Sequence, residues 1–335
     1  MIFKRPCSDT AIRAASVGAM PLAHHQISLR IYPHSGTAPK ILAGCVAQAR
    51  LAEAAGWDGV MTSEHHGGFP AYLPNPLQVA GWLLEETDRI WAAPCPLLLP
   101  LYHWSHVAEQ LAWLSARFPG RVGAGFAIGG LEQDFEMADC EFSDRLARFK
   151  ESLPKITAAL RGDAAEPFVL DPALAACASH PVPMVSAAQS PGAVRRAAHV
   201  GIGVLFDSMQ TLARMRELTD VYAENGGSGA RIAIRRVWLG PPPNAAVEDQ
   251  MDFYRSYAPD AAQRHWGDGQ ELITGMTAEE VAERLLKVAQ EGGANAFNLR
   301  VHLKDVPQEK VDEQIERIGH EVIPILRPAL ESLAR

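Results

Sequence analysis

The chain has 335 residues, of which 47% are hydrophobic, so it can bury one large core or two ordinary ones. Its formal net charge of −8 and its pI near 5.8 argue against nucleic acid or an anionic membrane as the main partner. No apolar run is long enough for a transmembrane helix, and the first nineteen residues lack the apolar run of a signal peptide. We therefore interpret residues 1–19 as a loose N-terminal extension and residues 20–335 as a single domain.

Cysteine usage bears on the compartment and on metal binding. The five cysteines are odd in number, widely spaced and without a CxxC pair: Cys7, Cys45, Cys95, Cys140 and Cys177. This pattern favours reduced thiols over a disulfide framework or a zinc site. We expect a cytoplasmic protein without a structural metal.

Strand-like and helix-like segments alternate along nearly the whole chain, which is typical of a parallel sheet covered by helices. The predicted strands are 27–32, 59–63, 90–99, 121–126, 182–187, 204–206, 231–239 and 296–301. The predicted helices are 40–55, one opening at Asn75, 105–117, 143–160, 191–200, 209–225, 277–291 and 308–330. Eight such units predict an α/β fold, a (β/α)8 TIM barrel, with an insertion at about 241–275 after the seventh strand. A doubly wound open sheet is the alternative.

Three helix starts carry capping signals. Asn75 precedes Pro76 and is followed by Gln78, and Thr277 is followed by Glu280, so both sites fit a capping box. Ser190 precedes Pro191 and is predicted to be an N-cap as well.

The second predicted strand ends in Glu64-His65-His66, the most informative segment of the chain. Active sites of parallel α/β proteins are built at the carboxyl ends of their strands, and imidazoles titrate near neutral pH. The segment therefore predicts a site for proton transfer. The alternative for His65 on its own is a core histidine at a strand end.

The many small residues in the segment 120–130 raise the question whether this segment binds a nucleotide. A Rossmann fingerprint needs its third glycine to open a helix directly, but three residues separate Gly125 from Gly129 and an acidic loop follows. The fingerprint therefore fails. The glycines allow close packing of a barrel strand, and the same lack of side chains would admit a flat ring. A better phosphate candidate is the segment Ser186 to Gly192, because amides at the start of a helix attract anions, although the Ser190 oxygen is commonly occupied by its own helix.

Several ordered motifs together resemble one family. They are Ala54-Ala55-Gly56-Trp57-Asp58-Gly59-Val60, Ser63-Glu64-His65-His66, Asn75-Pro76, Leu98-Leu99-Pro100 followed by His103, Gly120-Arg121 with Gly123 and Gly125, Arg145 with Phe149 and Glu151, Ser186 to Ser190, and Val322-Ile323-Pro324-Ile325-Leu326-Arg327. In this order they resemble the bacterial-luciferase-like family of flavin- and deazaflavin-dependent barrel oxidoreductases, over about residues 27–327.

The resemblance implies a reduced flavin across the carboxyl-terminal mouth of the barrel, where an oxygen adduct or a hydride does the chemistry. His65 matches an active-site histidine, with Glu64 and His66 as positioning residues. Arg145 and Ser190 match flavin-phosphate contacts, within the matched segment that begins at Ser186. Arg145 could instead pair with Glu141 or Asp144 on the helix surface.

The family often has a cis peptide in the third strand, beneath the flavin ring. The matching bond is Cys95–Pro96, and a cis bond before proline costs only about 0.5–1 kcal/mol, so we predict that it is cis. The alternative is that Pro94 and Pro96 only bend the strand. Gly125 and Ala127 are expected to face the same ring. Ala127 and Ile128 replace the reactive cysteine and a phosphate-binding arginine of bacterial luciferase, which argues against light emission.

These features favour a flavin-dependent monooxygenase that uses reduced FMN and O2 on a small organic substrate. A separate flavin reductase is expected to supply the cofactor, because no NAD(P) fingerprint is visible, and the resemblance implies a homodimer. His65 would transfer protons, Trp104 and Phe126 would form walls, and Arg300 would orient an anionic substrate or pair with a nearby helix. The segment 241–275 is expected to shape the substrate pocket.

Two alternatives stay open. An F420-dependent dehydrogenase or reductase shares the barrel and most motifs, but the longer acidic tail of F420 favours a basic groove and no Lys/Arg cluster is visible in the sequence. A non-catalytic flavin-binding barrel is the second, because of the departures at Ala127 and Ile128.

Overall fold

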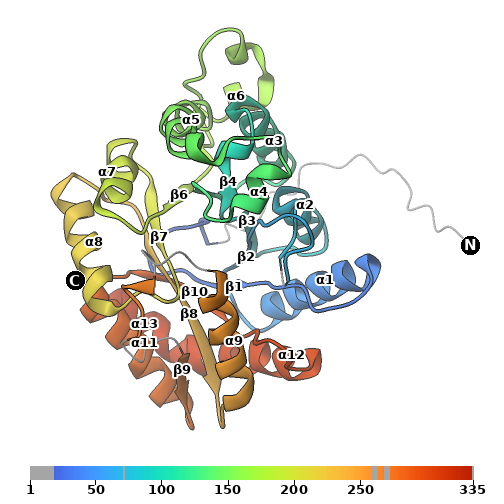
Figure 1. Ribbon diagram of the computed structural model, residues 1–335, viewed down its shortest axis with the longest axis vertical. Helices are drawn as coiled ribbons and strands as arrows, with labels where there is room; N and C mark the ends of the chain where they lie inside the picture. The colour runs from blue at the N-terminus through green and yellow to red at the C-terminus, as the bar shows by residue number, and fades with distance from the viewer. Residues whose placement is uncertain (1–18, 71, 258–262, 268–271, 334–335) are drawn as a thin grey trace, which may run out of the picture.

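The computed structural model describes residues 19–70, 72–257, 263–267 and 272–333, so the predicted extension 1–19 lies outside the described residues except for its last position. Nine strands in this part of the chain follow one path, β3-β2-β1-β10-β8-β7-β6-β5-β4, and every pairing along it is parallel (Figure 1). The strands are β1 (Ile27–Arg30), β2 (Gly59–Thr62), β3 (Trp91–Pro94), β4 (Leu97–Leu98), β5 (Ala124–Ala127), β6 (Met184–Ala187), β7 (Gly203–Phe206), β8 (Arg231–Leu239) and β10 (Ala296–Arg300).

The two ends of this path meet, which makes a nearly closed barrel. β3 and β4 are two parts of the single strand predicted at 90–99, and an isolated bridge joins Ala92 to Val122 just before β5. The amide of Ala92 donates to the carbonyl of Arg121 at 2.9 Å, and the amide of Gly123 donates to the carbonyl of Ala92 at 3.2 Å. The predicted TIM-barrel-like fold is confirmed, and the doubly wound alternative is excluded.

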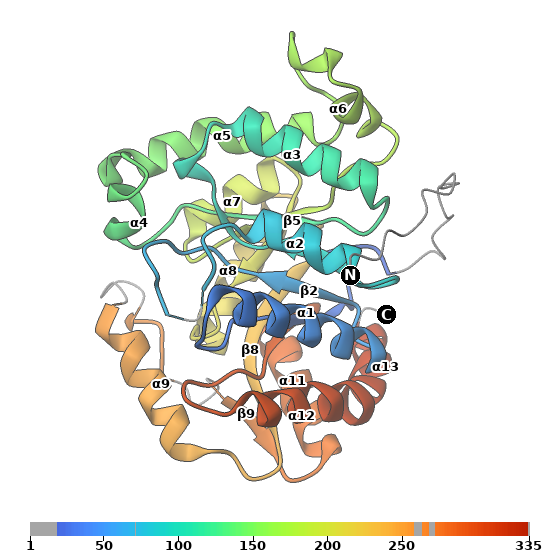
Figure 2. The same cartoon turned by 90° about the vertical axis from the view of Figure 1, so that its right-hand side faces the viewer.

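Helices cover the outside of the barrel, and Figure 2 shows α3 beside α5 on one flank with α11 and α12 on the other. The helices of five or more residues are α1 (Ala38–Ala54), α2 (Pro76–Glu85), α3 (Trp104–Arg117), α4 (Glu132–Glu136), α5 (Arg145–Ala159), α6 (Pro172–Ala176), α7 (Pro191–His199), α8 (Leu212–Glu224), α9 (Asn244–Tyr257), α11 (Ala278–Gly292), α12 (Gln308–Arg317) and α13 (Ile323–Leu333). Within the described ranges, none of the helices has both the length and the apolar character needed to cross a bilayer.

Three predicted segments differ in detail. The third strand breaks at the Cys95–Pro96 bond, which is cis as predicted. The helix predicted at 308–330 is divided by a π-helical turn, Ile318–Val322. A π turn holds one extra residue, so it shifts the helix that follows. The predicted insertion contains α9 and a further strand, β9 (Leu272–Gly275), which extends the sheet by pairing in parallel with the second half of β8.

Two of the three predicted caps form. Ser190 accepts from the amide of Ala193 and Thr277 accepts from that of Glu280, both at 3.3 Å. Asn75 stands at the N-cap position, but its side chain donates to the Gln78 side chain at 2.6 Å and caps no amide.

Side chains alternate between the two faces of each barrel strand. One buried cluster gathers inner-face residues, among them Met61, Ala93, Cys95, Val185, Leu205, Ile232 and Ala296. A larger cluster fills the space between strands and helices and includes Leu29, Val60, Phe126, Val204 and Phe297. Further along the inner face, towards the carboxyl ends of the strands, polar residues replace the apolar ones, namely Asn298, Arg30, Arg236 and Arg300. The alternation thus builds an apolar base and a polar mouth.

Candidate active site

A histidine–carboxylate pair lies at the carboxyl end of β2. Nδ1 of His65 and Oδ2 of Asp134, in α4, are 2.8 Å apart, and the other Asp134 oxygen accepts from the backbone amide of His66 at 2.8 Å. The Asp134 side chain is 2% exposed and that of His65 is 18% exposed. Asp134 therefore fixes the imidazole from the buried side and favours a proton on Nδ1, while the ring keeps one edge open to ligands.

Glu64 forms several hydrogen bonds at the same end of β2. Its fully buried carboxylate accepts from the Leu98 amide at 2.6 Å, from the Tyr102 hydroxyl, and pairs with Nε2 of His66 at 3.0 Å. The hydrogen bond to Glu64 raises the pKa of His66, against the opposing effect of burial. Burial and the adjacent Glu64 charge also raise the pKa of Tyr102. These contacts hold the segment 64–66 rigidly, in line with the positioning role expected for Glu64 and His66.

Aromatic rings continue from His65 across the mouth. The His65 ring lies 4.7 Å from that of Phe69 and 4.5 Å from that of Tyr72, between ring centres. Tyr72 in turn meets Tyr32 edge-on at 5.3 Å, with 3.5 Å between the two hydroxyl oxygens. The row of rings makes a surface that excludes water beside the imidazole.

Arginines gather at the far end of this row, which corrects one sequence-based expectation. No Lys/Arg cluster was visible in the sequence, yet Arg30, Arg236 and Arg300 are all buried at the mouth, with 3%, 1% and 2% exposure. Arg30 and Arg300 end β1 and β10, and Arg236 lies within β8 opposite Arg300; the three strands are neighbours in the barrel. Barrel closure brings them together from positions up to 270 residues apart, because β1 pairs with β10.

The residues predicted to contact the flavin ring lie between β3 and β4 and on β5. Cys95 is fully buried, and a Cβ on Gly125 would lie 2.1 Å from its Sγ, so the glycine makes room for the thiol. The close-packing interpretation of Gly125 is thereby confirmed. Burial raises the pKa of Cys95 to about 12, so the thiol stays protonated. Ala127 stands one inner-face position further along β5 and is partly exposed, and Pro96 follows the cis bond.

The residues predicted to bind the flavin phosphate lie in different environments. Ser186 is buried on β6, opposite Phe126 in the register, and therefore on the helix-facing side. Ser190 is exposed at the start of α7, where its hydroxyl is engaged by the Ala193 amide. Arg145 donates to the carbonyl of Phe142 at 2.7 Å and stacks on that ring at 3.7 Å. Within the described residues it pairs with neither of the two acidic neighbours considered from the sequence.

The three residues predicted to contact the substrate also lie in different environments. Phe126 is fully buried between strands and helices, so its position does not support a role as a wall of the mouth. Trp104 packs edge-on against Phe168 at 5.0 Å. Arg300 does lie inside the mouth, where it donates to the hydroxyls of Tyr32 and Tyr254.

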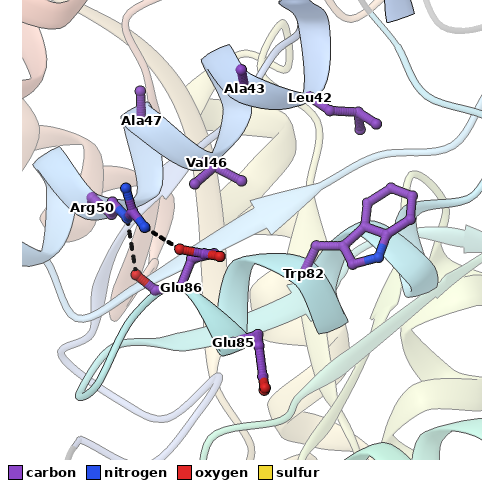
Figure 3. Close-up of a pocket in the computed structure, with 8 residues that line it drawn as sticks. All are labelled: Leu42, Ala43, Val46, Ala47, Arg50, Trp82, Glu85 and Glu86. Atoms are coloured by element: carbon purple, nitrogen blue, oxygen red, sulfur yellow. Dashed lines mark hydrogen bonds and ion pairs between the residues drawn. The ribbon is translucent and has the colours of Figure 1, made fainter. Parts of the chain in front are cut away.

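A hollow of about 500 Å³ on the outer surface lies between α1 and α2 (Figure 3). Its apolar floor is formed by residues such as Val46 and Leu42, and Trp82 stands at one side. Arg50 and Glu86, which line it, form an ion pair with each other (Figure 3). Because this hollow lies on the helical layer and its facing charges are already paired, the barrel mouth is the better candidate active site.

Three important residues could not be recognised from the sequence: Asp134, Arg30 and Arg236. Asp134 lies in the acidic loop that follows the glycines, but its neighbours Glu132 and Glu136 are exposed and nothing local distinguishes it from them. The one available signal for the arginines is a charged residue within or at the end of a mainly apolar strand, on the inner-face phase of the alternation.

Fold and geometry together define an α/β barrel with a candidate active site at the carboxyl ends of its strands. Residues 24–296 match the model of the luciferase-like monooxygenase family, and the chain belongs to that family. The family is one of flavin- or F420-dependent oxidoreductases.

Individual relatives divide between two cofactors. The chain is 32% identical over 129 residues to the N-acetyl-S-alkylcysteine monooxygenase of Bacillus subtilis, a match that spans 38% of this chain and only 39% of that relative. It is 29% identical over 293 residues to the F420-dependent glucose-6-phosphate dehydrogenase of Beutenbergia cavernae, covering 82% of each. The fold is similar to that of the oxygenating constituent of 3,6-diketocamphane monooxygenase from Pseudomonas putida in complex with FMN, with a TM-score of 0.71, 17% identity, and coverage of 91% of this chain and 99% of that one.

Proposed function

We propose that this protein is a flavin-dependent monooxygenase that uses reduced FMN and O2 to oxidise a small organic substrate. The observation that carries the proposal is the contact of 2.8 Å between Nδ1 of His65 and Oδ2 of Asp134 at the barrel mouth. With Nδ1 held by a carboxylate, Nε2 is the nitrogen that is left to give or take a proton. The match to the Bacillus subtilis monooxygenase supports the reaction class.

The residues at the ends of β5 and β6 fit a flat ring with a phosphate tail. Ala127 is small, partly exposed and on the inner face, and Ser190 presents an exposed hydroxyl at the start of α7. Ala127 would lie against the ring, and Ser190 with Arg145 would bind the phosphate. When bound, the reduced flavin supplies the electrons that activate oxygen. The protein's own part is to hold the substrate, exclude water with Phe69 and Tyr72, and move a proton at Nε2 of His65.

The second candidate is an F420-dependent dehydrogenase, which the Beutenbergia cavernae relative favours because that match covers far more of both chains. The arginines at the mouth do not decide in its favour. They form one compact cluster, whereas a long acidic tail needs an extended basic groove. A barrel that binds flavin without turnover is the third candidate, and the ordered pair of His65 and Asp134 is what speaks against it.

Equilibrium titration of the purified protein with FMN and F420, each oxidised and reduced, tests the ranking. We expect tighter binding of reduced FMN than of reduced F420, together with oxygen consumption when reduced FMN and substrate are mixed with the protein. Tighter binding of reduced F420 would make the dehydrogenase the better assignment. Flavin binding without consumption of oxygen or reduced F420 would favour the non-catalytic barrel.

Two features of the assembly are part of the same proposal. A separate flavin reductase supplies reduced FMN, and the active protein is a homodimer. Light scattering coupled to size exclusion tests the second, with a mass of twice 36.3 kDa as the expected result.

A further inference from the structure

Three buried guanidinium groups share one face at the barrel mouth. Arg236 and Arg300 are direct register partners on β8 and β10, and Arg30 ends the next strand, β1. Alternation places all three on the inner face, above Asn298 and Ser28. Like charges on adjacent strands repel each other, so this arrangement is unfavourable on its own.

Within the described residues, none of their hydrogen-bond partners is a carboxylate. Arg30 donates to the side chain of Asn298 at 2.6 Å, to Ser63 and to the carbonyl of Cys95. Arg300 donates to the carbonyl of His302 at 3.2 Å, to two tyrosine hydroxyls and to Gln250.

Arg236 is the least satisfied of the three. Its Nη1 reaches the Ser208 hydroxyl at 3.2 Å and the sulfur of Met209 at 3.3 Å. Three buried nitrogens of this cluster, Nη2 of Arg30 and both Nε and Nη2 of Arg236, have no hydrogen-bond acceptor in the described structure.

A partly buried arginine elsewhere shows the usual arrangement. Arg327, in α13, places Nη1 at 2.8 Å and 2.7 Å from the two carboxylate oxygens of Asp58. None of the three mouth arginines takes part in an ion pair among the described residues. A buried charge left without a counter-ion costs several kcal/mol, so the cluster lacks the feature that normally justifies burying arginine.

Aromatic rings hold these guanidiniums in place and connect them to the imidazole. Arg300 lies 3.7 Å from the centre of the Tyr32 ring, and Arg236 lies 4.6 Å from that of Tyr254 in α9. Burial lowers the pKa of Arg300 to about 10; Tyr32 opposes this shift, and the charges of Arg236 and Arg30 add to it. The three arginines in turn lower the pKa of Tyr32 against the opposing effect of burial. From Tyr32 the row of rings leads through Tyr72 to His65.

Building on the proposed function, we infer that Arg30, Arg236 and Arg300 form an anion subsite for the substrate. The substrate class is then a small organic molecule that carries one oxyanion group, a carboxylate, sulfonate or phosphate, some distance from the atom that is oxidised. Planar guanidinium forks match the paired oxygens of such groups, and the vacant donor positions on Arg30 and Arg236 supply the hydrogen bonds. The reactive end would then extend along the aromatic row towards His65.

The phosphate of the cofactor is the other possible source of an oxyanion, and the barrel order favours the substrate. The two residues matched to the flavin phosphate, Arg145 and Ser190, stand at the starts of α5 and α7, which follow β5 and β6, whereas the arginines lie on β8, β10 and β1. A flavin anchored by Ser190 would therefore place its phosphate on the side of β5 and β6, while Arg30 reaches the backbone carbonyl of Cys95, a residue matched to the ring, at 3.2 Å.

Thermal unfolding in sodium sulfate, with sodium chloride at equal ionic strength as the reference, tests the subsite. We expect a saturable rise of the wild-type Tm by about 2 °C at ten times the dissociation constant of sulfate. Arg236→Met should lose this saturable rise, and its Tm without ligand should equal or exceed that of the wild type, because an uncompensated buried charge is removed. Sulfate also stabilises proteins by exclusion, but that effect does not saturate and is common to all variants.

Arg327→Met is the matched control, because it removes an arginine that is already paired. It should lower the Tm without ligand and keep the saturable response to sulfate. If Arg236→Met does not fold, Arg236→Lys decides: we expect at least a tenfold weaker response, because the ammonium group cannot form a fork. An unchanged sulfate response in either Arg236 variant, or no saturable response in the wild type, would overturn the inference.

Flavin titration separates the two sources of the oxyanion. Wild type and Arg236→Met should bind FMN and riboflavin with affinities that differ by less than twofold between the two proteins. A tenfold loss of FMN binding in the variant, with riboflavin binding unchanged, would assign the cluster to the cofactor phosphate and refute a substrate subsite. Absence of flavin binding in the wild type would count against the proposed function alone, because the sulfate titration contains no flavin.

Discussion

Nδ1 of His65 and Oδ2 of Asp134 lie 2.8 Å apart, although 69 residues separate them in the chain. The contact joins the end of β2 to the short helix α4, and it orients the imidazole, whose Nε2 has no hydrogen-bond partner among the described residues. Its carboxylate is almost completely buried, so water does not compete for the hydrogen bond.

Replacing the imidazole tests its role in proton transfer. His65→Gln should lower kcat by about 100- to 10,000-fold, because a positioned acid–base group contributes that much, while flavin affinity changes little. Steady-state rates of oxygen consumption together with flavin titration provide the measurement. His24→Gln, at an exposed histidine that contacts the Ser228 carbonyl, is the control and should keep the wild-type rate. Equal rates for His65→Gln and wild type would remove His65 from the mechanism.

Replacing the carboxylate tests orientation. Asp134→Asn keeps the shape but supplies an amide in place of the acceptor, so the imidazole loses its preferred tautomer. We expect kcat to fall by about 10- to 100-fold with KM nearly unchanged. Because a loss of folded protein would give the same kinetic pattern, the Tm of the variant must equal that of the wild type. Glu136→Gln, on the exposed side of the same helix, is the control. A parallel rise in KM would indicate that Asp134 contacts the substrate instead.

The hydrogen bond between His66 and Glu64 should make the free energy of unfolding of the protein depend on pH. The hydrogen bond from Glu64 raises the pKa of His66 in the folded protein above its ordinary value of 6.5. The stabilisation is therefore complete below the pKa that His66 has in the unfolded protein. It is lost as the pH rises through the pKa that His66 has in the folded protein. Urea unfolding of wild type and His66→Asn from about pH 5 to about pH 9 should show a stability difference that shrinks with rising pH. In a Glu64→Gln background this pH dependence should disappear; its persistence would point to another group.

Close packing of Gly125 against Cys95 predicts a large effect of one methyl group. A Cβ at position 125 would lie 2.1 Å from the sulfur and 3.1 Å from Cα of Cys95. Gly125→Ala should therefore destabilise the protein by about 1–3 kcal/mol, the usual range for overpacking a core. Chemical denaturation measures this, and Cys95→Ala in the same chain should recover part of the loss. Gly130→Ala is the control, because nothing lies within 4 Å of its added Cβ; similar losses at both positions would contradict the packing argument.

The order of strands and helices and the place of His65 at a strand end could be predicted from the sequence. Each depends on patterns that repeat within a few residues: alternation in β2 and β10, or a serine followed by proline at the start of α7. The cis bond at Cys95–Pro96 was predictable for a similar reason, since it needs only a proline at a position matched to the family.

The local signals were less informative where an element contributes only a few residues or depends on distant ones. α9 and β9 lie in a segment with no recognisable motif, and β9 exists only because the long strand β8 offers it an edge. Phe126 is a related example, because its phase along β5 decides whether it faces helices or the mouth, and that phase is set by register.

By itself, the sequence determined a barrel of alternating elements with a histidine at its mouth, because hydrogen bonding and side-chain alternation along a strand are local. Only the tertiary structure decided which charges meet there. Barrel closure sets β1 beside β10 and β10 beside β8, and so gathers Arg30, Arg236 and Arg300. The fold of the loop after β5 selects Asp134 among three acids. Electrostatic energy depends on distance in space, and that distance is fixed only when the ring of strands is complete.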